Sequence, residues 1–308
     1  MSGRKEVEKT KMAKDFLERL RNGEALVIYG PIHTLLEQEV RRNLDGHLSE
    51  WIVNHPREFQ KVTKAMYAAG CDIGATGTQG NGRYRLRDFG LEDRLYEWTL
   101  KQVQLTKEVT PENCYVLGHL GPTGVFLEPL GDVTADELYK SYVEQIIPML
   151  EGGVDILYCS ENDTEQLAIA IKAVKDHCDL PVWGQNLFYP TKRGFRTLMG
   201  VDVKTASARL AEAGADVVGA GCGGISPIGD ALTVVKEMRQ GCDKPLSIKP
   251  DAGLAQFIDG KIVQPVTPEQ MAEEIPGWIA AGASLVGGCC GTSLEHLKAI
   301  SAAAKAVS

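Results

Sequence analysis

The hydrophobic positions of this chain gather into eight short runs rich in Val, Ile, Leu and Ala, and a stretch with helical periodicity follows each run. Continuous apolar runs of this length are typical of strands buried on both faces of a parallel sheet. Alternating strands and helices predict an α/β fold. Four runs close a repeated phrase of helix, Gly-containing turn and strand at 66–78, 149–161, 210–222 and 279–290, and the other four lie at 25–30, 114–121, 181–188 and 245–253.

Eight such units favour a closed (β/α)8 TIM barrel over an open doubly wound sheet. The carboxyl ends of all eight strands of a barrel surround one active site, whereas an open sheet offers a crevice only where the strand order reverses. No linker or low-complexity tract interrupts the pattern, so we expect residues 1–308 to form a single domain. Polar or reactive residues are predicted at the strand ends, namely His33, His119, Cys159, Asn186, Cys222, Lys249, Cys289 and Cys290.

The start signals of two helices stand out. Thr134 precedes an amphipathic stretch with Glu137 three residues later, which is the pattern of a capping box. Thr267 precedes another stretch with Pro268 at its first position, where proline is tolerated because that backbone nitrogen needs no partner. We therefore expect helices to begin at both threonines.

Composition narrows the class of protein. The net charge of −8 argues against nucleic acid or an anionic membrane surface as the main partner. The polar N-terminal stretch lacks the apolar core of a signal peptide, and no run approaches the length of a membrane-spanning helix. We expect a cytoplasmic protein whose eight cysteines are free thiols rather than a disulfide framework.

Three cysteines carry the candidate chemistry. Cys222 closes the run 215–222, and the pair Cys289 and Cys290 closes the run 283–290. A barrel brings such distant strand ends together, and three thiolates suit Zn²⁺, which favours tetrahedral sulfur ligation. Three protein ligands leave a fourth position for substrate or water, so the pattern predicts a catalytic zinc ion that could hold a substrate thiol as thiolate.

The chain resembles the zinc-dependent homocysteine S-methyltransferases, which include betaine–homocysteine methyltransferases and the N-terminal barrel of cobalamin-dependent methionine synthase. The segments that carry the resemblance are GGCCGT (287–292), GAGCGGISP (219–227) and LGPTGVFLEPLGDVTADELYKSYVEQI (120–146). The resemblance implies a (β/α)8 barrel, zinc ligation by Cys222, Cys289 and Cys290, and attack of a zinc-held thiolate on a methyl group of an activated donor.

Two positions depart from the family pattern. The Asp expected after the first strand is Tyr29, and the Glu–Thr pair expected after the fourth is Cys159–Ser160. The resemblance implies that those two carboxylates hold the ammonium group of homocysteine. Either Glu161 or Asp163 replaces them and the substrate is still homocysteine, or the substrate has no ammonium group there.

The predicted function is methyl transfer between a small methylated donor and a thiol or corrinoid acceptor, the corrinoid being carried by a separate protein. The alternatives are a homocysteine S-methyltransferase that makes methionine, a non-catalytic zinc-stabilised barrel closed by a fourth ligand such as Cys159, and a Schiff-base lyase that uses Lys249. The residues predicted to line the substrate pocket are Tyr29, His33, Gly77, His119, Cys159 and Asn186.

Overall fold

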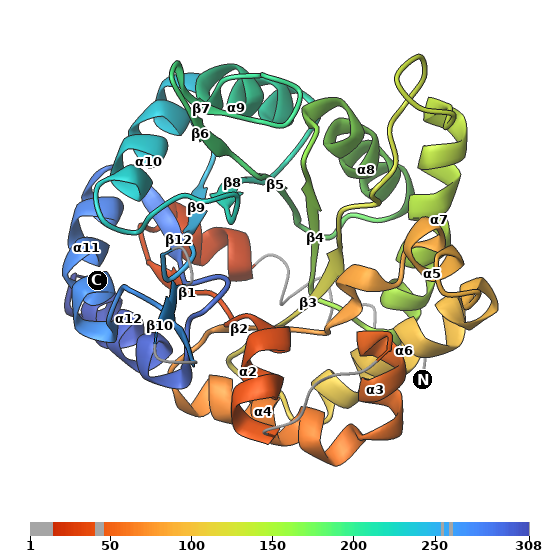
Figure 1. Ribbon diagram of the computed structural model, residues 1–308, viewed down its shortest axis with the longest axis horizontal. Coiled ribbons are helices and arrows are strands. Elements are labelled where there is room, and N and C mark those ends of the chain that lie inside the picture. Colours follow the sequence, from red (N-terminus) through yellow and green to blue (C-terminus); the bar gives the residue numbers. More distant parts are fainter. Residues whose placement is uncertain (1–14, 41–45, 254–255, 259–260, 308) are drawn as a thin grey trace.

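The computed structural model describes residues 15–40, 46–253, 256–258 and 261–307, and it forms a (β/α)8 barrel (Figure 1). Eight parallel strands are hydrogen-bonded in the order β1-β12-β9-β8-β5-β4-β3-β2. The backbone N–H of Asp72 donates to the carbonyl of Val27 at 2.9 Å, which links the two ends of that order and closes the ring. The strands are β1 (Leu26–Val27), β2 (Ile73–Ala75), β3 (Tyr115–Leu120), β4 (Ile156–Glu161), β5 (Val182–Asn186), β8 (Val217–Gly221), β9 (Leu246–Lys249) and β12 (Ala283–Val286).

Helices surround the strands as an outer layer (Figure 1). A helical segment at 15–21 precedes β1, and two 3-10 turns, η1 (Thr78–Gly80) and η2 (Glu92–Arg94), follow β2. The helices are α2 (Ile32–Val40), α3 (Leu48–Asn54), α4 (Pro56–Ala68), α5 (Arg83–Arg87), α6 (Leu95–Lys107), α7 (Ala135–Gly152), α8 (Thr164–His177), α9 (Val203–Glu212), α10 (Asp230–Gly241), α11 (Pro268–Ala280) and α12 (Leu294–Val307).

Local sequence explains where two of these helices begin. Thr134 and Glu137 form the expected capping box at the start of α7, because each side chain accepts a hydrogen bond from the other residue's backbone N–H. Thr267 forms an equivalent box with Gln270 at the start of α11, and Pro268 occupies its first turn. Both predicted helix starts are confirmed.

The strands are apolar on both sides because they pack against the helices outside and against one another inside. β3, β4, β5 and β8 are buried along their whole length. Trp183 is fully buried, and its ring centroid lies 4.5 Å from that of Tyr158 on the neighbouring strand. The interior of the barrel is thus a packed core rather than a channel, as in other (β/α)8 folds.

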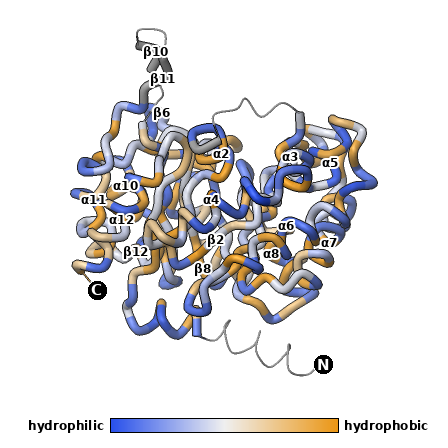
Figure 2. The backbone as a smooth tube through the Cα atoms, turned by 90° about the horizontal axis from the view of Figure 1, so that it is seen from below, coloured by the Kyte–Doolittle hydropathy of each residue, from blue (hydrophilic) through white to orange (hydrophobic). Residues whose placement is uncertain are grey.

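Two small hairpins extend the strand ends beyond the predicted pattern. The first pairs β6 (Tyr189–Thr191) with β7 (Gly194–Arg196) after β5, and the second pairs β10 (Gln256–Ile258) with β11 (Lys261–Val263) after β9. Figure 2 shows β6, β10 and β11 at the same end of the molecule. Because both hairpins follow the carboxyl ends of barrel strands, this is the end at which barrel active sites lie.

Candidate metal centre and substrate pocket

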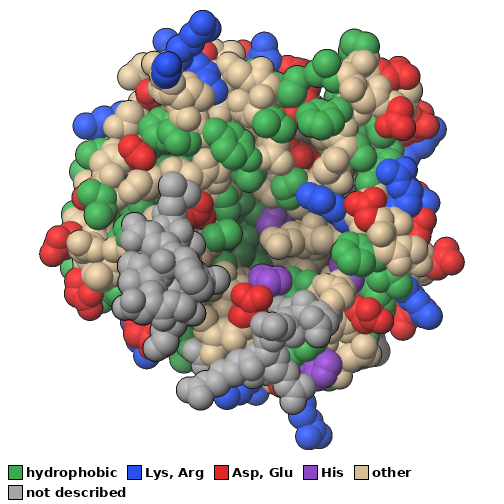
Figure 3. Space-filling view, in the orientation of Figure 1, with side chains coloured by type: hydrophobic (Ala, Val, Ile, Leu, Met, Phe, Trp, Pro, Cys, Tyr) green, Lys and Arg blue, Asp and Glu red, His purple; other side chains and the backbone are tan. Residues whose placement is uncertain are grey.

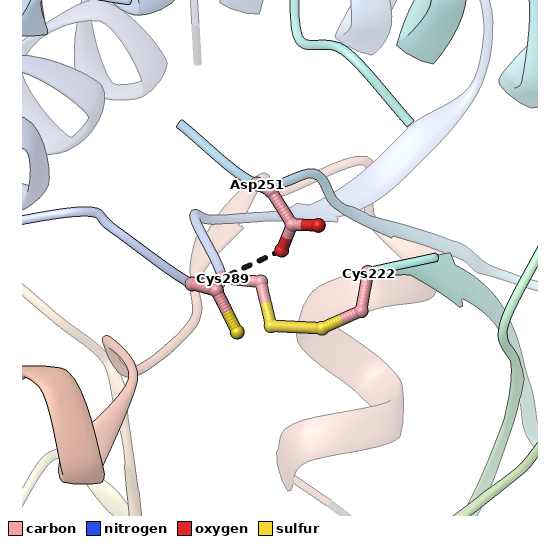
Figure 4. Close-up of side chains that lie close together, drawn as sticks. Cys222, Asp251 and Cys289 are labelled. Carbon is pink, nitrogen blue, oxygen red and sulfur yellow. Dashed lines mark hydrogen bonds between the residues drawn. A yellow bond between two sulfur atoms is a disulfide. The ribbon is translucent and has the colours of Figure 1, made fainter. Parts of the chain in front are cut away.

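Three cysteines and one aspartate converge at the carboxyl end of the barrel (Figure 4). Cys222 follows β8, Asp251 follows β9, and Cys289 and Cys290 follow β12. The sulfur atoms of the cysteines and a carboxylate oxygen of Asp251 all lie within 4.8 Å of one another. Within the described part of the chain, this is the one group of His, Cys, Asp and Glu side chains with the proximity that a metal ion requires.

The strand order explains this convergence. β8, β9 and β12 are neighbours in the sheet, so residues far apart in sequence leave the barrel side by side. The N–H of Cys222 donates to the carbonyl of Lys249 at 3.2 Å, and the N–H of Cys289 donates to the carbonyl of Pro250 at 2.7 Å. The N–H of Cys290 donates to Asp251 Oδ1 at 3.1 Å. These bonds fix the three loops to one another.

The backbone is left-handed at several positions in these loops, and two of them adjoin or contain a cysteine of the cluster. Cys222 has a φ of 54°, which is uncommon for a residue with a side chain and turns its sulfur out of the line of β8. Gly291 has a φ of 80°, and a Cβ there would lie 2.3 Å from Cδ of Gln264. Glycine directly after the cysteine pair is therefore a steric requirement.

A disulfide joins Cys222 to Cys289 in this structure, with their Cα atoms 6.1 Å apart (Figure 4). This corrects the expectation that all eight cysteines are free thiols. The strand-end proximity of Cys222 and Cys289 that suits a metal ion also allows their sulfur atoms to bond. The described cysteines outside this pair are free.

The donor set fits zinc once the disulfide is reduced. Zinc binds cysteine sulfur at about 2.3 Å in a tetrahedral arrangement, so sulfur ligands lie roughly 3.8 Å apart. That spacing falls within the 4.8 Å over which these ligand atoms are gathered. Burial raises the pKa of the Cys290 thiol, and the charge of Asp251 raises it further. The thiolate form therefore needs a cation beside it.

A second group of side chains, here called the inner cluster, lies on the inner face of the barrel beside the cysteines. The Nε2 atom of His119 and the hydroxyl of Ser160 are 2.9 Å apart. The ring of His119 lies 4.4 Å from that of Tyr158, centroid to centroid. Burial, together with the charge of Lys249, holds the pKa of His119 well below its usual range, so the imidazole is neutral. The inner cluster consists of Tyr29, His119, Tyr158, Ser160 and Lys249.

Lys249 is the only described lysine or arginine that is buried, with 3% of its surface exposed. Its Nζ atom lies 3.5 Å from the centroid of the Tyr29 ring, which is a cation–π contact. Burial lowers the pKa of the Lys249 ammonium to about 7. Burial also raises the pKa of Tyr29. The molecule is hollowed at the centre of the face seen in Figure 3.

The structure brings some predicted pocket residues together and separates others. Tyr29 and His119 belong to the inner cluster. Gly77 lies in the loop after β2, where its carbonyl accepts a hydrogen bond from Gln102 at 3.1 Å. His33 is exposed on helix α2 beside Glu37, rather than at a strand end as predicted.

Cys159 and Asn186 point away from the inner cluster. Neighbouring residues of a strand face opposite sides, so Cys159 lies on the opposite face from Tyr158 and Ser160. It is buried, and it is not part of the group around Cys222. Asn186 accepts a hydrogen bond from Thr164 at the start of α8 and ties that helix to the sheet. Neither placement is that of a pocket residue.

The two carboxylates considered as replacements for the family's pair are also occupied elsewhere. Glu161 accepts hydrogen bonds from the hydroxyl of Tyr142 on α7 and from the N–H of Thr123, both at 2.8 Å. Asp163 accepts from the N–H of Glu165 and caps α8. The inner cluster therefore has no described carboxylate of its own, although the charge of Asp251 acts on Lys249.

Sequence reasoning missed Tyr158 and Ser160 and gave Lys249 little weight. The two-residue period of a strand separates Tyr158 and Ser160 from Cys159 and Glu161, but it does not say which pair faces inward. The pairing of β3 with β4 decides it, because His119 lies opposite Tyr158. Lys249 could have been found from its charge, since an ammonium in an otherwise apolar strand is rare.

The structure is a (β/α)8 barrel in which three cysteines that could hold a metal ion converge at the carboxyl ends of the strands. The model of the homocysteine S-methyltransferase family matches residues 26–304, and the chain belongs to that family. The chain is 28% identical over 276 residues to methionine synthases of Mycobacterium leprae and Mycobacterium tuberculosis. The alignments cover 85% of this chain and 22% and 23% of those proteins, so the chain spans less than a quarter of their length.

Solved structures agree on the fold. The metallated form of the homocysteine methyltransferase MmuM from Escherichia coli superposes with a TM-score of 0.73 at 21% identity, covering 91% of this chain and 96% of that one. Its oxidized form gives the same TM-score at 20% identity, with coverages of 90% and 95%. The described helices include none that is long and apolar enough to span a membrane.

Proposed function

We propose that this protein is a zinc-dependent methyltransferase that moves a methyl group between a small methylated donor and a thiol or corrinoid acceptor. One observation carries the proposal: the sulfur atoms of Cys222, Cys289 and Cys290 gather within 4.8 Å at the end of the barrel where active sites lie. Membership of the homocysteine S-methyltransferase family supports the reaction class. We propose the zinc ligands to be these three cysteines, with the fourth position open to substrate.

With a thiol acceptor, the reaction requires a nucleophilic sulfur at neutral pH. Bound zinc supplies this by favouring the thiolate form of a coordinated thiol. The three cysteines hold the ion, and Asp251 orients the loop of the cysteine pair by accepting the N–H of Cys290. In the forward direction the substrate thiol loses its proton to solvent and its sulfur forms a bond to the methyl carbon. The bond from that carbon to the donor breaks, and its electron pair leaves with the donor.

The acceptor is the part of the proposal that most needs a direct test. Homocysteine is favoured by the family name and by the methionine synthase relatives. The inner cluster lacks the carboxylates that the family resemblance implies for the homocysteine ammonium group, which favours a thiol without an ammonium group or a corrinoid on a separate protein. The chemistry at the donor is the same in each case.

The test is a methyl-transfer assay with anaerobically reduced, zinc-loaded protein. A panel of methylated sulfonium and quaternary ammonium donors is supplied with homocysteine, 3-mercaptopropionate or a cob(I)alamin carrier. Formation of methionine or of the methylated thioether, or conversion of the cob(I)alamin spectrum to that of methylcobalamin, is expected with at least one donor.

Cys290→Ser should abolish the transfer because it removes a zinc ligand, whereas the matched control Cys242→Ser, at the end of α10, should leave it intact. Full zinc loading without transfer to any of the three acceptors across the panel would contradict the proposal. It would favour the alternative of a non-catalytic zinc-stabilised barrel.

A further inference from the structure

Lys249 has no ion-pair partner among the described residues, although only 3% of its surface is exposed. Its Nζ atom lies over the face of the Tyr29 ring. Burial opposes the ammonium form, which the nearby charges of Cys290 and Asp251 favour. Burying an ammonium without a carboxylate partner is costly, so such a group is retained where a ligand supplies the missing charge.

The position of Lys249 relative to the cysteines is fixed by the backbone. Lys249 is the last residue of β9 and pairs with Gly221, the residue before Cys222. Its carbonyl accepts the N–H of Cys222 at 3.2 Å. On the other side, β9 pairs with β12, which leads to Cys289 and Cys290. The ammonium group therefore lies on the inner face of the barrel, beside the place where a thiol would enter.

Apart from Lys249, the inner cluster consists of side chains without a charge. His119 is neutral and shares a hydrogen bond with Ser160. Tyr29 offers the face of its ring to Lys249. The carboxylates of Glu161 and Asp163 are held by other partners. A substrate ammonium placed here would meet Lys249, and among the described residues only Asp251 could offer it a carboxylate.

We propose that Lys249 determines substrate specificity by binding an anionic group, such as a carboxylate, on the non-reacting end of the thiol substrate. This inference rests on the proposed function and names the substrate class of that site. It differs from recognition of an amino acid through its ammonium group, because the selecting charge on the protein is positive. Asp251 lies beside the cysteines and accepts a hydrogen bond from the N–H of Cys290 (Figure 4).

Equilibrium binding of simple thiols tests the inference without a methyl donor. Anaerobically reduced, zinc-loaded protein is titrated calorimetrically with 3-mercaptopropionate, its neutral amide and 3-aminopropane-1-thiol, and with the analogues that are one methylene longer. We expect the carboxylate to bind about 10- to 100-fold more tightly than the amide or the amine of the same length, as one charge-assisted hydrogen bond allows.

Lys249→Met should reduce that preference to near unity while the zinc content stays at that of the wild type, and Lys249→Arg should retain part of the preference. Lys236→Met, on the exposed face of α10, is the matched control and should keep the full preference.

The inference is overturned if the wild type binds the three kinds of thiol equally. It is also overturned if Lys249→Met keeps the preference, or weakens all three kinds by the same factor, because the lysine would then only balance the charge of the cysteines. Absence of zinc, or of any thiol binding by zinc-loaded protein, overturns the proposed function and this inference with it. Binding without discrimination overturns the inference alone.

Discussion

At the scale of single residues, Glu161 shows how burial changes the pKa of a side chain, which the sequence alone does not reveal. The carboxyl group lies at the end of β4 and is 3% exposed. Burial raises its pKa from 4.5 to about 7, although the hydrogen bonds from Thr123 and Tyr142 oppose the shift. A carboxyl with a raised pKa in the folded state stabilises the fold when it is protonated. That contribution is fully present below pH 4.5 and is lost as the pH rises through about 7.

Glu161→Gln should remove this pH dependence, because an amide keeps an oxygen acceptor for both partners and carries no charge. As the pH rises from 4.5 to 8, the free energy of unfolding of the variant should increase relative to that of the wild type by up to about 3 kcal/mol. One pKa unit corresponds to about 1.4 kcal/mol. Urea unfolding at several pH values measures the difference. Parallel curves for the two proteins would contradict the assignment, and the exposed Glu212→Gln serves as the control.

The same scale marks the limit of sequence reasoning about the site. Cys222, Cys289 and Cys290 could be chosen because glycine-rich runs place them at strand ends and because cysteine has few chemical roles in that pattern. Cys159, Asn186 and Glu161 could not be placed, since each lies at a strand end but on the face that packs against helices. Which side chains of a strand point into the barrel depends on the register with the neighbouring strand. That register depends on contacts between residues distant in sequence.

At the scale of elements, β8 is closely packed on its inner face. A Cβ at Gly219 would lie 2.6 Å from both Oγ of Ser247 and Nε1 of Trp183, which belong to the strands on either side. Those two polar atoms and Oε1 of Gln185 are buried without a hydrogen-bond partner in the described structure. Glycine is needed here for space, not for an unusual backbone conformation.

Gly219→Ala should therefore destabilise the protein by about 1–3 kcal/mol, the usual cost of inserting a methyl group into a packed core. Gly277 in α11 provides the opposite case, because nothing lies within 4 Å of a Cβ placed there. Gly277→Ala should stabilise the protein by about 0.4–1 kcal/mol by restricting the unfolded chain. Chemical denaturation gives the free energy of unfolding of both variants. A Gly219→Ala protein as stable as the wild type would contradict the close packing around Gly219.

Strands and helices could be predicted where the hydrophobic pattern was continuous. The eight barrel strands and the starts of α7 and α11 follow from apolar runs and capping residues. The hairpins β6–β7 and β10–β11 were missed because each strand has only three residues and neither carries an alternating pattern long enough to recognise. Both lie at the carboxyl end of the barrel, where loops vary most between barrels that share a fold.

At the scale of the whole molecule, the barrel is what gathers the chemistry. Cys222 and Cys289 are 67 residues apart in sequence, and only the adjacency of β8, β9 and β12 brings them together. The family resemblance predicted this arrangement, and the sequence predicted that the two carboxylates of the family pattern are missing here. The structure gathers the cysteines and places Tyr29 and Ser160 in the inner cluster with Lys249. The common fold and the lining of the pocket are thus set by different parts of the barrel.

X-ray absorption at the zinc edge of the reduced, zinc-loaded protein tests the central claim most directly. Without thiol, three sulfur ligands at about 2.3 Å and one lighter ligand are expected, and excess thiol should raise the count to four sulfurs. No bound zinc, or a ligand set unchanged by thiol, would contradict an open zinc site built from Cys222, Cys289 and Cys290.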